Sequence, residues 1–178
     1  LGSPTSAWGA VRQDRLPGVA GKLGATPAMV PVSATITAPD RSRSFNFEVM
    51  RHRDLLPILA RSALISAMEA AEKLAGDASL VLSSQLHLRD GRTLESTQFY
   101  SGPSAALIAS LEAVQPLIAL ARSRFTGLDV DSLAFTVHIR EGISRARITG
   151  LRLNTAQVRA GRSYALEITL APFQTDAI

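Results

Sequence analysis

Hydrophobic side chains recur at every second position along much of this chain, which is the spacing of a β-strand with one buried face. The clearest case is the alternation of Leu133, Phe135, Val137 and Ile139 with polar or small neighbours. Similar patterns predict further strands over residues 32–37, 44–50, 80–88, 92–100, 146–153 and 164–170. The sequence therefore predicts a protein built mainly from strands that bury one side.

Short polar segments between these strands contain the residues that tight turns need. Pro39-Asp40-Arg41 predicts a turn between the first two strands, and Asp90-Gly91 is the strongest two-residue hairpin signal in the chain. Glu141-Gly142 is expected to turn the chain after the strand that ends near Ile139. The last three strands are thus expected to form a meander, with a further turn at residues 158–161.

The strand predicted after Gly142 changes its apolar phase partway along. Ala146 and Ile148 occupy one alternation, whereas Leu151 and Leu153 occupy the other, and Gly150 lies at the switch. A β-bulge inserts one extra residue into a strand. We therefore predict a bulge at Gly150.

Two segments show helical spacing instead of alternation. Asp54 is the expected N-cap of a helix over residues 55–74, with Gly76 closing it. A second helix is expected to begin at Ser101-Gly102-Pro103, to run toward Arg122 and to end at Gly127. Proline lacks the amide hydrogen that a helix interior uses, so Pro116 should kink this second helix.

Glycines and prolines break the regular pattern between Trp8 and Val32. Gly18, Gly21 and Gly24 recur every three residues, which neither a stable helix nor a central strand favours. A phosphate-binding loop needs a helix directly after its glycines, and the prolines at positions 27 and 31 oppose one, although Lys22 is present. We expect a loop laid over another part of the protein rather than a nucleotide site.

These elements together predict an α+β fold in the order loop-ββα-ββα-βββ. The sheet should be mostly antiparallel, with two helices packed on one face, because that arrangement buries every apolar stripe. The expected organisation is a Gly/Pro-rich loop segment over residues 1–31 and an α+β domain over residues 32–178, forming one folding unit.

Composition narrows the possible functions. The chain has 178 residues, a formal net charge of +4 and no cysteine, which excludes disulfides and thiolate metal sites. Its arginines are scattered and aromatic residues make up 5%, so we expect no nucleic-acid partner. Apolar runs long enough to cross a bilayer are not evident, and we expect no transmembrane segment.

The histidines and carboxylates of this sequence show few patterns that are typical of a metal or catalytic site. His52, His87 and His138 lack partners at metal-ligand spacing on a shared face, and they are interpreted as exposed side chains. Asp129 and Asp131 have the spacing of a carboxylate pair that binds a cation or shares a proton, but a solvated strand entrance is the favoured interpretation.

Glu69 and Glu72 are expected on the exposed face of the first helix, with Glu69 paired to Lys73. No serine shows the neighbours of a catalytic triad. We therefore expect no catalytic, cofactor-binding or metal residue in this chain.

Four segments resemble the SpoIVB-type serine peptidase family, in particular its long bacterial members. They are the block GAVRQDRLPGVAGKLGATPAMVPV, the FNFEV strand at 45–49, the helix entry DLLPIL at 54–59 and the closing segment from Val158 to Tyr164. The resemblance covers most of the chain. It implies the portion of an exported peptidase that follows the catalytic motifs, and hence an extracytoplasmic location in the periplasm or cell envelope.

The catalytic motifs of that family are not matched here. The family carries a serine in Ser-Gly-Ser-Pro and a histidine after glycine, whereas the three histidines here follow Arg51, Leu86 and Val137. Gly2-Ser3-Pro4 echoes the serine motif with Leu1 in place of its first serine, but Ser3 has no matched histidine as a base. The resemblance therefore implies a non-catalytic scaffold or docking portion, whose partner is the peptidase portion of its own chain or a second copy.

Each hypothesis makes a structural prediction. A docking portion should expose Trp8, Val11, Val19 and Leu23, or pack them against a second copy. A small-molecule enzyme should gather several polar residues in one cleft, namely Asp129, Asp131, His138, Arg140 and Arg147. An extracytoplasmic binding module should offer a free strand edge, such as residues 164–170, to a peptide.

Overall fold

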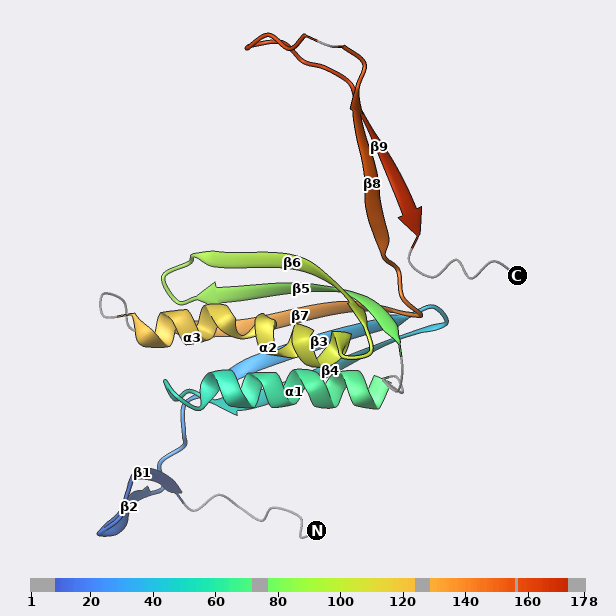
Figure 1. Cartoon of the computed structure of the whole chain (residues 1–178). Helices are drawn as coiled ribbons and strands as arrows, with labels where there is room; N and C mark the ends of the chain where they lie inside the picture. Colours follow the sequence, from blue (N-terminus) through green and yellow to red (C-terminus); the bar gives the residue numbers. More distant parts are fainter. Residues whose placement is uncertain (1–8, 72–76, 124–128, 156, 173–178) are drawn as a thin grey trace.

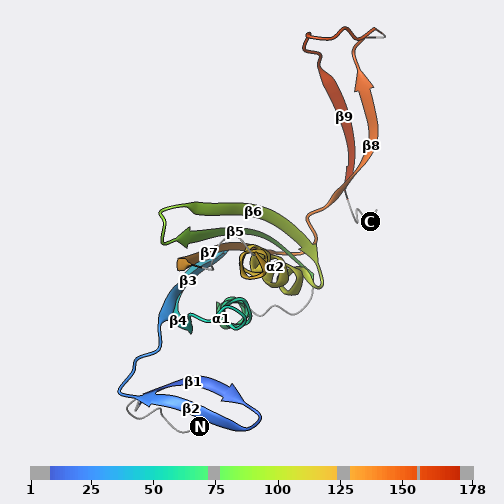
Figure 2. The same ribbon diagram turned by 90° about the vertical axis from the view of Figure 1, so that its left-hand side faces the viewer.

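The computed structural model describes residues 9–71, 77–123, 129–155 and 157–172. In this part of the chain the protein has an α+β fold: a five-stranded sheet with helices along one side, and two separate two-stranded hairpins (Figure 1). The two hairpins project from the sheet-and-helix body, one below and one above it in both views (Figures 1 and 2).

The sheet is formed by two hairpins and one additional strand. β3 (Met29–Ala38) pairs with β4 (Arg41–Met50), and β5 (Ala78–Leu88) pairs with β6 (Thr93–Gly102), both antiparallel. The predicted turns at residues 39–41 and at Asp90-Gly91 are confirmed. Gly91 has a φ of +86°, a conformation that favours glycine.

The additional strand, β7 (Val130–Glu141), lies in the middle of the sheet and gives the order β4-β3-β7-β5-β6. It runs parallel to β3 and antiparallel to β5. The expected meander of the last three strands is therefore wrong. Both edges of β7 are already paired inside the sheet. The strands that follow it therefore cannot pair with β7, and they form a separate hairpin.

The core lies between the sheet and the helices. Alternate residues of the three central strands are buried there, and Val30, Ala34 and Val137 are completely inaccessible to solvent. Helix α1 (Leu56–Ala71) buries the side of its surface that carries Ala60, Leu64, Ala67 and Met68. Residues 72–76, including the predicted closing Gly76, lie outside the described residues, as does Gly127.

The second predicted helix is divided into α2 (Ala105–Ala113) and α3 (Gln115–Arg122). The break falls at Val114, two residues before Pro116, so the predicted kink is confirmed. Among the described residues, only the segment from Ala105 to Arg122 has the length and composition of a membrane-spanning helix. Ala109 and Leu117 of this segment are buried in the core.

The glycine-rich block forms a hairpin instead of the expected loop, and it covers no other element of the described chain. Its strands are β1 (Gly9–Arg15) and β2 (Gly18–Leu23), which pair antiparallel. Gly9 and Gly21 permit this pairing, because a Cβ atom at Gly9 would lie 2.4 Å from the Lys22 carbonyl oxygen and one at Gly21 would lie 3.2 Å from that of Ala10. The glycines therefore allow two strands to approach closely.

Candidate functional site

The C-terminal hairpin has one wholly apolar face. Its strands are β8 (Ala146–Leu153) and β9 (Leu166–Pro172), and we call this hairpin the C-arm. The register pairs Ile148 with Leu170, Leu151 with Ile168 and Leu153 with Leu166. Side chains of paired residues lie on the same face, and residues two apart on β9 also share a face. All six apolar side chains therefore form one continuous surface.

A bulge in β8 produces this single face. The register shifts between Ile148 and Gly150, which confirms the bulge predicted at Gly150. Without the extra residue, Leu151 and Leu153 would point to the side opposite Ile148. The reverse face of the C-arm is polar and carries Arg147 and the facing pair Arg152 and Glu167.

The N-terminal hairpin, which we call the N-arm, also gathers apolar residues on one face. The register of this hairpin also shifts, between Val11 and Gln13. Val19 and Leu23 lie on the same face of β2 as Gly21, and Val11 pairs with Gly21, so Val11, Val19 and Leu23 share that face. These three side chains are 66%, 66% and 83% exposed, which confirms the exposure expected of a docking portion. Trp8 lies outside the described residues.

The apolar faces of both arms contact no other described element of the chain. The six C-arm residues are each between 42% and 64% exposed. A two-stranded hairpin in water is marginally stable, and apolar side chains gathered on one exposed face usually mark an interaction surface. The arms therefore expose apolar faces of the kind that usually mark an interaction surface.

A serine cluster attaches the C-arm to the sheet. Buried Ser79 on β5 and Ser101 on β6 lie 2.8 Å apart at their hydroxyl oxygens, and the Ser79 hydroxyl donates to the Gly142 carbonyl oxygen at 2.7 Å. The Ser144 backbone amide donates to the Ser79 oxygen at 2.8 Å. Gly142, with a φ of +82°, also donates from its amide to the Asp77 carbonyl oxygen. These bonds fix the point at which the chain leaves the sheet.

The three histidines do not converge. His87 on β5 shares a 3.0 Å hydrogen bond with Thr93, and exposed His52 accepts from the Asp54 backbone amide at 3.2 Å. His138 is exposed near the end of β7. Within the described ranges, three or more histidine or acidic residues nowhere gather as a metal site would require.

Asp129, the first of the two neighbouring carboxylates, forms ion pairs with two arginine side chains. Asp129 lies 3.6 Å from Arg51 and 3.5 Å from Arg89, and its carbonyl oxygen accepts from the Arg89 amide at 3.0 Å. Asp131 is exposed. Arg51 also donates to the carbonyl oxygens of Met29 and Val130, so this group joins the starts of β3 and β7.

The cleft expected of a small-molecule enzyme does not gather its predicted residues. His138 and Arg140 border a depression of 770 Å³ at one end of the sheet, together with Ser79 and Ser144. Asp129 and Asp131 lie at the opposite end of β7, and Arg147 lies on the C-arm.

Glu69 is an exposed residue of α1, whereas Ser3, Glu72 and Lys73 lie outside the described residues.

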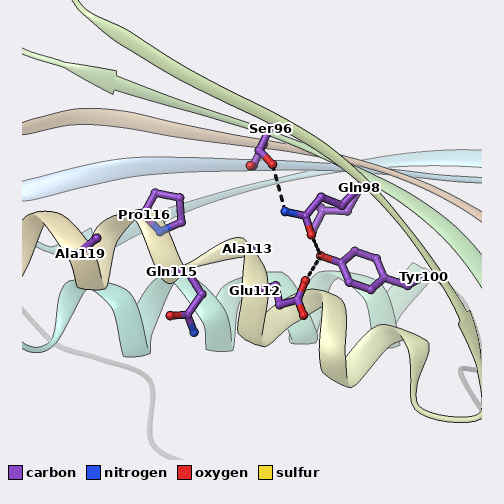
Figure 3. A pocket seen from close by; sticks show the side chains of 10 residues that line it. Ser96, Gln98, Tyr100, Glu112, Ala113, Gln115, Pro116 and Ala119 are labelled. Atoms are coloured by element: carbon purple, nitrogen blue, oxygen red, sulfur yellow. Dashed lines mark hydrogen bonds between the residues drawn. The ribbon is translucent and has the colours of Figure 1, made fainter.

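A groove that the sequence did not predict lies between β6 and the helices α2 and α3 (Figure 3). Tyr100 donates toward Gln98 at 2.6 Å and toward Glu112 at 2.9 Å, and Gln98 donates to Ser96 at 3.3 Å. Burial and the adjacent Glu112 carboxylate raise the pKa of Tyr100, which keeps the phenol neutral. Tyr100 pairs with buried Leu80 across the β5-β6 hairpin, which places its side chain on the face of β6 that points toward the helices.

Comparison with known proteins adds no relative: no family model, curated protein or solved structure matches this chain.

Proposed function

We propose that this chain is the non-catalytic docking portion of an exported SpoIVB-like serine peptidase or pseudopeptidase. Its sheet and helices act as a scaffold, and the N-arm and C-arm bind the peptidase portion of the same protein. The extracytoplasmic location is part of the proposal and follows from the resemblance alone.

The exposed apolar face of the N-arm is the observation that carries this proposal. The block that resembles the peptidase family is the one that forms this arm, and its Val11, Val19 and Leu23 are exposed together. Such a face costs solubility unless a partner covers it. The dispersed histidines and the ion-paired Asp129 also favour docking over catalysis.

The first test examines the native coding sequence and the product encoded upstream of Leu1. We expect a Gly-His motif and a Ser-Gly-Ser-Pro motif there. When that upstream portion is produced separately and mixed with this chain, calorimetry should detect a complex. Absence of both motifs would contradict the proposed family, and absence of a complex would contradict the docking role.

Variants of the N-arm test which surface forms this complex. Changing Val11, Val19 and Leu23 together to serine should weaken the association at least tenfold, because it removes the apolar face. The control is Leu16→Ser at the tip of the same arm, where the side chain is fully exposed and lies outside the paired strands. Equal weakening by both variants would contradict docking through this face.

A binding module that accepts a peptide at a free strand edge is the alternative that the structure also favours. β9 pairs only with β8, so its outer edge has no strand beside it in the described chain. This alternative predicts that an added peptide slows hydrogen exchange of the amides of residues 166–170.

A further inference from the structure

We propose that the groove between edge strand β6 and helices α2 and α3 binds an extended peptide from another protein. The peptide pairs with the free edge of β6 as an additional strand and directs a basic side chain to Glu112. This site is separate from the two arms, so it goes beyond the docking function proposed above.

The edge formed by β6 has few of the features that usually protect exposed strands from pairing. Natural edge strands carry charged side chains, above all lysine, as well as proline or bulges, or they are short. β6 has 10 residues with one charged side chain, Glu95, and without lysine, arginine or proline, whereas β4 at the other edge carries Arg41 and Arg43. The less protected edge is therefore the one that borders the groove.

The groove matches the geometry of an added strand. Leu94, Ser96, Gln98 and Tyr100 alternate along β6 and face the helices, since they pair with the buried side of β5. A strand laid beside β6 would direct every second side chain into the same space. The main part of the groove encloses 610 Å³, and its helical wall contains the small residues Ala113 and Ala119. This space suits short apolar side chains.

The length of the groove sets the length of the peptide. Its lining continues from Tyr100 past Ser96 to Leu94, where a smaller cavity shares Ser84, Ser96 and Pro116 with it. At roughly 3.3 Å per residue, this stretch of β6 spans about 20 Å and pairs with about seven peptide residues. Leu94 is 43% exposed and would gain a neighbouring strand.

The charge of the groove selects the peptide. Among the described residues that line its main part, only Glu112 has a charged side chain, and no described arginine or lysine forms an ion pair with it. Tyr100 remains a neutral donor that orients the Glu112 carboxylate. A carboxylate in a groove whose described lining carries no positive charge favours a basic side chain on the ligand. We therefore expect a segment that alternates small apolar residues with a lysine or arginine.

Fluorescence anisotropy with synthetic peptides tests the proposal. The probe is a labelled heptapeptide, Thr-Val-Thr-Val-Thr-Arg-Thr, and the matched peptide has glutamate in place of arginine. The arginine peptide should bind with a Kd below about 1 mM and at least tenfold more tightly than the glutamate peptide. Hydrogen exchange of the amides of residues 94–100 should slow when the arginine peptide is present.

Three variants, one of them a control, locate the binding site on the protein. Glu112→Lys should weaken binding of the arginine peptide about tenfold or more and reverse the preference between the two peptides. Glu48→Lys makes the same charge change on exposed β4 and should leave the Kd unchanged. Ala119→Trp fills the groove from the exposed surface of α3 and should abolish binding of both peptides. Circular dichroism of each variant verifies that it is folded.

Backbone N-methylation of the peptide separates strand addition from simple burial of side chains. Two peptides are needed, each methylated at alternate amides, because only the amides that face β6 donate to it. One methylation pattern should abolish binding and the other should preserve it. Equal binding of the arginine and glutamate peptides, no effect of Glu112→Lys, or no difference between the two methylated peptides would overturn the proposal.

The same experiments separate this site from other occupants and from the docking function. Self-association of the chain that is lost in Glu112→Lys, without peptide binding, would overturn the proposal in favour of a second copy in the groove. Deleting Gly150 changes the C-arm and should leave the peptide Kd unchanged. Peptide binding that persists while the arm variants lose the peptidase portion would support the groove independently of the proposed function.

Discussion

The central sheet and the two arms use the same alternation of apolar and polar residues, but they expose it differently. In the sheet, Ile36 and Val137 are at most 1% exposed because α1, α2 and α3 cover that face. In the arms, Val11 and Leu151 are 66% and 64% exposed, since no described element covers them. The alternation of apolar and polar residues therefore identifies a face that should be buried, but it does not identify the element or partner that buries it.

Truncation of a leucine gives the largest expected contrast between the two regions. Leu64→Ala should lower the free energy of unfolding by about 2–5 kcal/mol, because Leu64 is completely buried. Leu151→Ala should change it by about 0.5 kcal/mol or less, because that side chain already contacts water. Urea denaturation of both variants measures the difference. A similar loss in both would mean that the C-arm packs on the body in solution.

The serine cluster at the base of the C-arm should give the next largest effect. Ser79→Ala should lower the free energy of unfolding by about 1–3 kcal/mol, because the Ser144 amide and the Gly142 carbonyl oxygen lose a partner. Ser83→Ala on the same strand is the control, since its bond to Thr97 is exposed. Equal effects of the two substitutions in urea denaturation would show that the cluster does not hold the arm.

Deleting Gly150 tests whether the bulge is what gives the C-arm its single apolar face. The deletion should move Ile148 or the two leucines to the polar side and weaken binding of the peptidase portion about tenfold. The unfolding of the sheet should be almost unchanged. Deletion of Ala160, outside the paired strands, is the control, and calorimetry measures both affinities. An unaltered affinity after removal of Gly150 would exclude the apolar face of the C-arm from docking.

The titration of Tyr100 should give the smallest effect on the free energy of unfolding. Tyr100 lies on β6, at the edge of the sheet that the helices cover. Because burial and then Glu112 raise the pKa of Tyr100, the unfolded chain loses this proton at a lower pH than the folded protein does. The neutral phenol therefore stabilises the fold fully below pH about 10, and this contribution falls as the pH rises toward the folded-state pKa.

Phenolate absorbance in a Tyr164→Phe background reports Tyr100 alone, because the chain has two tyrosines. Glu112→Gln in that background should lower the pKa of Tyr100 part of the way toward its ordinary value, since burial remains. An unchanged titration would mean that Glu112 does not contact the phenol in solution.

Local sequence signals predicted the elements of the fold more reliably than their arrangement. The hairpin turns at Asp40 and Asp90, the break near Pro116 and the bulge at Gly150 were predicted correctly, because each follows from the geometry of one or two residues. The hairpin formed by the glycine block was missed. Its glycines were interpreted as loop residues, whereas Gly9 and Gly21 permit close pairing of two strands.

The groove could not be predicted because its residues come from separate elements. Tyr100 and Glu112 are twelve positions apart and lie on β6 and α2, and neither carries a recognisable motif. Their contact exists because the β5-β6 hairpin places its outer strand beside α2. Sequence spacing contains no information on this placement.

Outside the glycine block, the sequence by itself determined which residues form strands and helices, where most of the turns and the bulge fall, and which side chains are apolar on each face. It did so because φ and ψ preferences and side-chain periodicity are local properties. Only the tertiary structure decided that β7 enters between β3 and β5, and that two hairpins with apolar faces remain outside. The reason is physical: a central position satisfies both edges of β7, so a strand that follows it cannot pair with β7.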